Sequence, residues 1–217
     1  MVEYRIKKVE GDFPPARMEA LLGRLPALRV ERYLWLKNGY EPRVEVRLCW
    51  SDRFLYVHFR VEEDKVRLRY RRFQDPVWKD SCVEMFIDPF PEKKRGYLNI
   101  EANALGTVLA AFGKGPQSRL PFSASQLREM EVAASISLPV DGPHGAPFWT
   151  LAYRLPLSVF KLCYGEPVRP GLVGRANFYK CGDETAIPHY GAWSPVASPK
   201  PDFHRPESFG RIIFEKD

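Results

Sequence analysis

Residues 77–90 read VWKDSCVEMFIDPF, and apolar and polar side chains alternate along them. The odd positions of the second half are apolar: Val83, Met85 and Ile87. The even positions carry a tryptophan and three carboxylates: Trp78, Asp80, Glu84 and Asp88. Because successive side chains of a strand point to opposite faces, the stretch predicts a strand with one apolar face and one acidic, aromatic face.

A second alternating run follows the polar loop PFPEKKRG. Residues 97–104 read YLNIEANA, in which Leu98 and Ile100 alternate with polar residues. An antiparallel hairpin of the two runs would bury the apolar face against an opposite sheet. The other face would add four polar side chains to the carboxylates: Tyr97, Asn99, Glu101 and Asn103.

The rest of the chain predicts more short strands. Alternating runs cover residues 2–9, 44–50, 54–62, 107–112, 130–138, 148–155, 175–180 and 209–215. Helical spacing predicts a short N-terminal helix over 15–25 and a helical turn over 156–160, and Gly106 marks a bend. We therefore expect an all-β fold in which residues 1–217 form a single-domain antiparallel β-sandwich of the jelly-roll or immunoglobulin-like kind. The loop 182–207 is expected to pack over one face or end.

Composition narrows the function classes. With 45% hydrophobic and 28% charged residues, the 217-residue chain is typical of a globular protein. Its net charge is +6, but the densest basic run, KVRLRYRR at 65–72, alternates with apolar residues and predicts a solvated strand face rather than a nucleic-acid interface. The four cysteines form no CxxC pair, so their spacing predicts no zinc site.

The N-terminus MVEYRIKKVEGDF has no apolar segment, and no window is long enough to span a membrane. A cytoplasmic location without a membrane partner is expected. A chain from which a signal peptide had been removed would be secreted and would look the same.

Sugar recognition explains an acidic, amide-rich sheet face on a basic protein. A pyranose offers flat CH faces that stack on an indole, and hydroxyls that pair with carboxylates and amides. The alternative is a half-solvated sheet whose polar residues pair with the surplus Lys and Arg.

The motifs VWKDSCVEMFIDP, YLNIEANALGT, RANFYKCG, AWSP and PDFHRPESFGRIIFE, in this order, resemble the carbohydrate-binding module family 9-like domains, relatives of the DOMON-type β-sandwiches. The resemblance extends from FLYVHFRVEED onward. It implies a β-sandwich that binds a glucose-type mono- or disaccharide between two tryptophans without catalysis, with a role in carbohydrate catabolism.

The resemblance also implies the ligand-binding residues. Trp78 and Trp193 would stack on the ring, and Glu84 and Asn103 would bond its hydroxyls. Lys79 and Arg119 are further candidates for charged donors to the ring hydroxyls. Both are chosen by their position in the chain, since neither belongs to a sharp motif. No cofactor is required, although some members bind structural calcium, for which Asp88 and Glu101 are the candidate ligands here without a DxDxD run.

Two other functions stay open. A glycoside hydrolase, or its accessory domain, could use Asp80 and Glu84, but these lie roughly 13 Å apart along one strand, beyond the about 5–9.5 Å that hydrolysis requires. Glu101 on the neighbouring strand could lie closer. A haem-binding DOMON-type domain could use Met85 with a histidine such as His58, but the parity of Met85 predicts a core position. A binding module is favoured over an enzyme, and no protein partner is indicated.

Overall fold

The alternating runs form the strands of the computed structural model, which describes residues 2–136 and 148–216. The first seven strands are β1 (Glu3–Lys8), β2 (Leu28–Val30), β3 (Arg32–Tyr33), β4 (Arg43–Trp50), β5 (Phe54–Glu62), β6 (Cys82–Asp88) and β7 (Tyr97–Asn103). The others are β8 (Val108–Gly113), β9 (Leu120–Pro121), β10 (Glu131–Ala134), β11 (Trp149–Pro156), β12 (Val173–Cys181), β13 (Tyr190–Ala192) and β14 (Gly210–Phe214).

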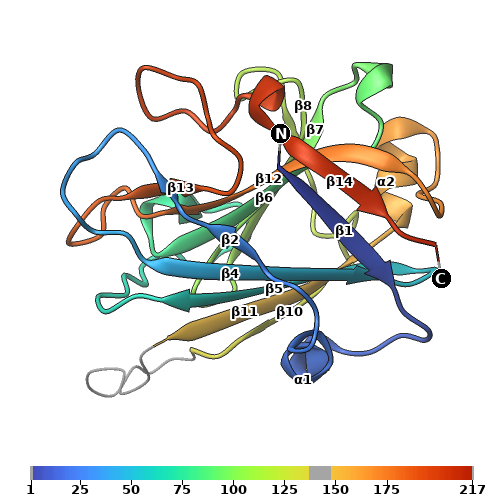
Figure 1. The fold of residues 1–217 in the computed structure, drawn as a ribbon, viewed down its shortest axis with the longest axis horizontal. Coiled ribbons are helices and arrows are strands. Elements are labelled where there is room, and N and C mark those ends of the chain that lie inside the picture. Colours follow the sequence, from blue (N-terminus) through green and yellow to red (C-terminus); the bar gives the residue numbers. More distant parts are fainter. Residues whose placement is uncertain (1, 137–147, 217) are drawn as a thin grey trace.

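These strands make two packed layers (Figure 1). One layer has the order β10-β11-β5-β4 and the other the order β14-β12-β6-β7-β8-β9. Strand β1 joins them at one edge, since it pairs in parallel with both β14 and β4, while the other pairs are antiparallel. The predicted all-β sandwich is confirmed.

The β6–β7 hairpin has the predicted apolar face. Val83 pairs with Ala102, and Met85 pairs with Ile100. Their side chains lie in the main core with Phe178 of β12. Met85 is fully buried there, as its parity predicts. The hairpin thereby turns its polar face away from the core, over the outer side of the sheet.

Two short helices cover parts of the sandwich. A 3₁₀ turn, η1 (Pro15–Arg17), leads into α1 (Met18–Leu22), whose Met18 and Leu22 pack on the outer face of β4 and β5. The helix α2 (Ser158–Tyr164) closes one end, where the Tyr164 hydroxyl donates to the Gly96 carbonyl at 2.9 Å. In residues 2–136 and 148–216, no helix has both the length and the apolar character that a membrane crossing requires.

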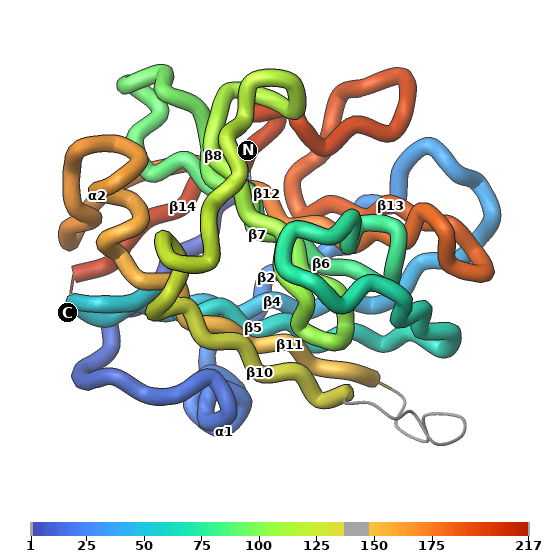
Figure 2. Tube along the Cα trace, turned by 180° about the vertical axis from the view of Figure 1, so that it is seen from behind, coloured from blue at the N-terminus to red at the C-terminus, as the bar shows by residue number. Residues whose placement is uncertain are grey.

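The structure corrects the prediction for residues 65–72, which form no strand. They run as an irregular segment beside β6 and β7 (Figure 2), because the Asp80 carboxylate accepts the backbone N–H groups of Arg69 and Tyr70, each at 2.8 Å. Both faces of β7 are consequently buried. The end of the predicted strand at 130–138 lies outside the described residues.

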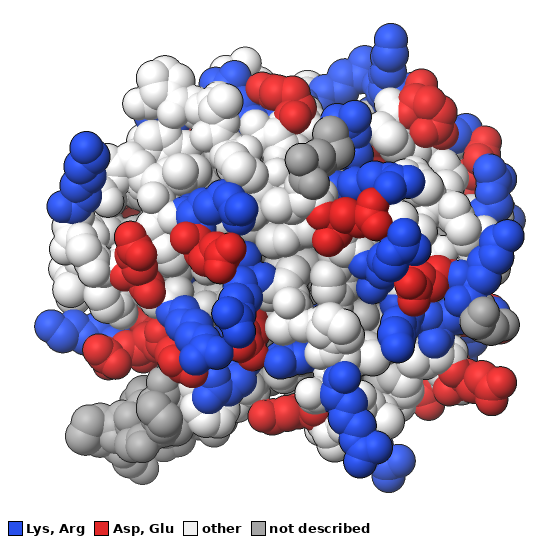
Figure 3. All heavy atoms as spheres, viewed as in Figure 1, with Lys and Arg blue, Asp and Glu red and all other residues white. Residues whose placement is uncertain are grey.

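Lys and Arg alternate with Asp and Glu over the face in Figure 3. In the basic segment 65–72, Arg67 forms ion pairs with Asp80 and Glu184. On the face in Figure 3, Lys and Arg do not gather into the basic stripe that nucleic-acid binding requires.

Candidate functional site

A cavity of about 270 Å³ lies over the outer face of the sheet, where β6, β7 and β12 run side by side. Strand residues supply its floor, namely Glu84, Glu101 and Cys181. Its walls come from several loops and from β13, which contribute Trp78, Arg119, Asp183, Tyr190 and the segment 201–204. Two residues of the polar face predicted from the alternation, Glu84 and Glu101, therefore lie on the floor of a cavity.

Two glutamates face each other on this floor. Glu84 and Glu101 are direct partners across β6 and β7, and they are only 4% and 3% exposed. The Cys181 thiol donates to Glu84 Oε1 at 3.0 Å. Glu101 Oε1 accepts the Asn99 amide at 2.8 Å and the Arg119 guanidinium at 3.2 Å. One cation therefore serves two buried carboxyls.

This arrangement changes the acidity of both carboxyls. Burial raises the pKa of Glu84 well above its usual range, and the charge of Glu101 raises it further. Burial also raises the pKa of Glu101, although Arg119 opposes that shift. Asp183, at the rim, has a raised pKa for the same reason. Within the described residues, the hydrogen bonds to Glu84 and Glu101 reach only Oε1 of each carboxyl, so Oε2 of each is left for a ligand.

Trp78 forms one wall and belongs to a 3₁₀ turn rather than to the strand. The turn η2 (Val77–Lys79) ends where the Asp80 N–H donates to the Val77 carbonyl at 3.0 Å. The loop after β12 is fixed to it, because the Asp183 N–H donates to the Trp78 carbonyl at 3.2 Å. The indole is partly buried against neighbouring aromatic residues and is held beside the two glutamates.

The facing wall is aromatic and comes from the long loop after β13. Phe203 stacks on Tyr179 with ring centroids 4.1 Å apart. His204 Nδ1 lies 2.6 Å from the Tyr97 hydroxyl, and His204 Nε2 lies 3.4 Å from Arg119 Nη1. Burial and Arg119 lower the pKa of His204 to about 4, so the ring is neutral near pH 7. A neutral ring that accepts from Arg119 at Nε2 donates from Nδ1 to Tyr97.

Trp193 lies outside this cavity. Its side chain is 5% exposed, belongs to the main core and meets Phe178 edge-on at 5.7 Å. Tyr190, three residues earlier, does line the cavity. Because residues three apart along a strand point to opposite faces, Trp193 turns inward where Tyr190 turns outward. The structure does not bring the two predicted tryptophans together.

Asn103 shares the polar face but does not reach the cavity. Its amide N–H groups donate to the Tyr70 carbonyl at 2.8 Å and to Asp80 at 3.0 Å, and its Oδ1 accepts the N–H groups of Leu105 and Thr107. These contacts fill its hydrogen-bonding capacity. Asn103 therefore fixes the turn after β7 and the segment before Trp78.

Lys79 does not line the cavity, and it forms an ion pair with Glu184 at 2.9 Å. The two proposed calcium ligands are also apart. Asp88 is the last residue of β6, and its Oδ1 accepts the Phe90 N–H at 3.1 Å. Glu101 is the cross-strand partner of Glu84, which lies four residues before Asp88 on β6. A single calcium site cannot use both. Asp80 is likewise engaged with backbone N–H groups and Arg67, and it does not line the cavity.

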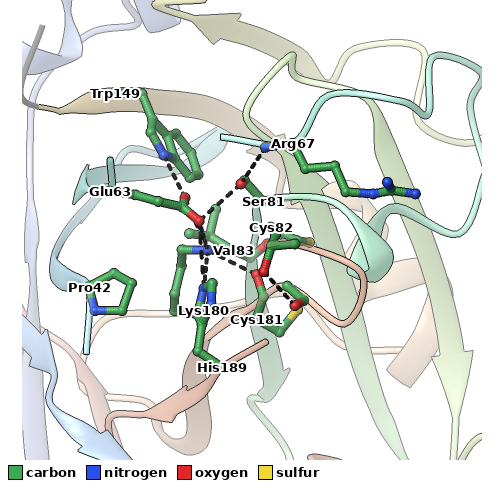
Figure 4. Close-up of polar contacts among 12 residues, drawn as sticks. Pro42, Glu63, Arg67, Ser81, Cys82, Val83, Trp149, Lys180, Cys181 and His189 are labelled. Carbon is green, nitrogen blue, oxygen red and sulfur yellow. Dashed lines mark hydrogen bonds and ion pairs between the residues drawn. The ribbon is translucent and has the colours of Figure 1, made fainter. Parts of the chain in front are cut away.

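A second cluster of buried charges lies between the layers, beside the cavity floor (Figure 4). Glu63 and Lys180 are 5% and 0% exposed and form an ion pair at 3.2 Å. Glu63 also accepts from Trp149 and Ser81, both at 3.0 Å. Lys180 also donates to the Cys181 carbonyl at 2.9 Å and to His189 Nε2 at 2.8 Å. We term these residues, Glu63, Lys180 and His189, the core cluster.

Sequence reasoning missed several cavity residues: Asp183, Asp202, Phe203 and His204. All of them lie outside the regular alternation of the long strands, in the loops on either side of β13. The only signal available was their chemical type, in GDET and PDFH. Tyr190, in PHYGAW, was a candidate from the sequence and does line the cavity.

Comparison with known proteins agrees with this architecture. The model of carbohydrate-binding family 9 matches residues 17–214. A protein from Bacteroides uniformis, proposed to bind carbohydrate, has a crystal structure that superimposes with a TM-score of 0.85 at 29% identity, over 98% of this chain and 99% of that one. A protein of Arthroderma benhamiae, described as extracellular, is 24% identical over 80% of this chain and 79% of its own length.

Two solved structures of a family 9 module from Caldicellulosiruptor kristjanssonii share the fold at lower identity. The complex with glucose has a TM-score of 0.68 at 11% identity and covers all of this chain and 97% of that one. The complex with cellotriose has a TM-score of 0.65 at 12% identity, over 99% of this chain and 95% of that one.

Proposed function

The chain belongs to carbohydrate-binding family 9, and from this premise we propose that it binds a small carbohydrate, without catalysis, in the cavity beside Trp78. The observation that carries the proposal is the joining of one partly buried indole, two buried carboxyls and one guanidinium around a single cavity. Indole supplies the flat apolar face that a pyranose needs, and the charged groups supply acceptors and donors for its hydroxyls.

The roles follow from the contacts. Trp78 stacks on one face of the ring, while Glu84 and Glu101 accept hydrogen bonds from its hydroxyls and Arg119 donates hydrogen bonds to them. We assign the apolar contact on the other side to Tyr190 and Phe203 in place of Trp193, because these two line the cavity. The cavity of about 270 Å³ is at the small end of ligand sites and suits a mono- or disaccharide end rather than a long chain.

Glucose and cellotriose are the natural first probes, since structures of the same fold contain them. A part in carbohydrate catabolism, a cytoplasmic location and kinship with DOMON-type sandwiches stay predictions. Hydrolysis is less favoured than binding: Glu84 and Glu101 lie side by side on the floor of the cavity, whereas the carboxyls of a glycoside hydrolase flank the scissile bond.

Calorimetric titration with glucose and cellotriose tests the proposal. We expect wild type to bind at least one of the two, and Trp78→Ala to weaken that binding about tenfold or more because the stacking surface is lost. Trp193→Phe is the matched control and should retain the wild-type affinity. Absence of binding to either sugar by the folded wild type would refute the proposal, and sugar turnover that Glu84→Gln abolishes would replace it with hydrolysis.

A further inference from the structure

Two cysteines that are 99 positions apart in the sequence meet under the cavity. Cys82 of β6 and Cys181 of β12 are direct cross-strand partners, and Glu84 follows two residues later on the same face of β6. One ligand atom from each of the three side chains lies within 4.8 Å of the other two. Cys82, Glu84 and Cys181 are 0%, 4% and 1% exposed. Two sulfurs and a carboxylate oxygen therefore share one small buried volume.

From this juxtaposition we infer that Cys82, Cys181 and Glu84 form a binding site for a thiophilic divalent ion such as Zn²⁺. Zinc takes thiolate sulfur at about 2.3 Å and carboxylate oxygen at about 2.0–2.2 Å in tetrahedral geometry, which places neighbouring ligand atoms roughly 3.5–3.8 Å apart. The three ligand atoms already lie close to such a set, with Cys181 Sγ and Glu84 Oε1 3.0 Å apart.

The site is open on one side. Cys181 and Glu84 line the cavity, so an ion bound to them would direct its fourth position toward the cavity, where water or a ligand hydroxyl can complete the tetrahedron. The same opening gives the ion its entry path. Cys82, Cys181 and Glu84 thus offer three protein ligands, and the cavity offers the one exchangeable position that catalytic zinc sites have.

Charge balance is met by neighbouring cations. Binding converts two thiols to thiolates and releases two protons to solvent, while Glu84 binds as the carboxylate. The resulting site carries one negative charge in total, with Arg119 and Lys180 both close enough to act electrostatically on its residues. Soft sulfur ligands favour zinc over calcium or magnesium, so this site differs in kind from a structural calcium site.

The inference does not depend on sugar binding, and the experiment keeps the two apart. Fully reduced protein, first stripped with a chelator, is dialysed against Zn²⁺, and the bound metal is measured by elemental analysis. We expect one zinc per chain in wild type. Cys82→Ser and Cys181→Ser should each lower the zinc affinity at least about tenfold, and Cys163→Ser, at a buried cysteine of α2, is the control that should retain the ion.

Co²⁺ provides a second readout that needs no variant. Cobalt bound by the two thiolates should give a sulfur-to-cobalt charge-transfer band in wild type and in Cys163→Ser. Less than half an equivalent of zinc, no such band, or zinc binding that persists unchanged in folded Cys181→Ser would each overturn the inference. Sugar titrations repeated in excess chelator report on the proposed function alone.

Discussion

The cavity floor and the core cluster bury charge within a few residues of each other, in opposite ways. In the core cluster, Glu63 is balanced by Lys180, and every donor of the Lys180 ammonium has a partner. His189 is neutral, because burial and Lys180 lower its pKa to about 3, and its Nδ1 bonds the Ile187 carbonyl at 2.8 Å. The core cluster is complete in itself.

The cavity floor is incomplete. The Arg119 guanidinium bonds Glu101 and acts on Glu84 only through its charge, and burial raises the pKa values of both carboxyls. A complete buried network rigidifies a core, whereas an incomplete one costs stability unless something else supplies the missing partners. The difference indicates that the core cluster serves the fold and that the cavity floor is arranged for a ligand.

The largest expected effect comes from breaking the core cluster. Lys180→Met should lower the free energy of unfolding by about 3–5 kcal/mol, because it leaves the Glu63 carboxylate buried without a cation. Urea denaturation measures the loss. The double variant Glu63→Gln/Lys180→Met should recover part of it, as coupled partners do. A single variant as stable as wild type would mean that the core cluster is not structural.

Removing a charge from the cavity floor should lower sugar affinity rather than the free energy of unfolding. Glu101→Gln removes one of two repelling carboxyls, so we expect the free energy of unfolding to stay within about 1 kcal/mol of wild type. Sugar affinity should fall roughly 10- to 100-fold, since a hydrogen bond to a charged acceptor contributes about 1.5–3 kcal/mol. Glu184→Gln, at an exposed ion pair, is the control for both measurements. Greatly reduced stability with unchanged affinity would reverse the assignment.

Acid should weaken the fold through buried neutral histidines. Burial lowers the pKa of His58 to about 4, and neither ring nitrogen has a partner. Below the unfolded pKa of about 6.5, the unfolded chain takes up a proton that the folded chain refuses, so stability falls as the pH drops toward 4. Between pH 7 and pH 5 one such histidine costs about 2 kcal/mol.

The His58→Phe variant isolates this contribution without touching either charge cluster. Its loss of unfolding free energy between pH 7 and pH 5 should be about 2 kcal/mol smaller than that of wild type. Equal losses in the two proteins would show that His58 is protonated in the folded state.

The smallest expected effect concerns Lys79. Lys79→Ala removes an exposed ion pair with Glu184 and no contact on the cavity floor. We expect the calorimetric Kd for the sugar to match that of wild type. A clear loss of affinity would restore Lys79 as a ligand donor.

The strands were predictable because alternation reports directly which face a residue takes. The hairpin of β6 and β7, with Met85 in the core and Glu84 opposite Glu101, follows from parity alone. The short strands β2, β3, β9 and β13 are too brief to show a period, and the parallel pairing of β1 depends on contacts with β14 at the far end of the chain.

The cavity was predictable only in part. Trp78, Glu84 and Arg119 do line it, whereas Trp193 and Asn103 do not. Alternation shows which face of a strand a residue takes, but it does not show what covers that face. It therefore could not reveal that Asn103 is hydrogen-bonded to the segment before Trp78. Nor could spacing bring Cys82 to Cys181, or Glu63 to Lys180, since each pair is joined by strand packing between distant segments.

The most direct test of the cavity as the carbohydrate site follows the indole N–H signals of the five tryptophans by NMR during titration with glucose or cellotriose. Single substitutions identify the Trp78 and Trp193 signals. We predict that the Trp78 signal shifts progressively to saturation while the Trp193 signal stays in place. A shift of Trp193 with Trp78 unmoved, or no shift of any indole at saturating sugar, would contradict the assignment of this cavity.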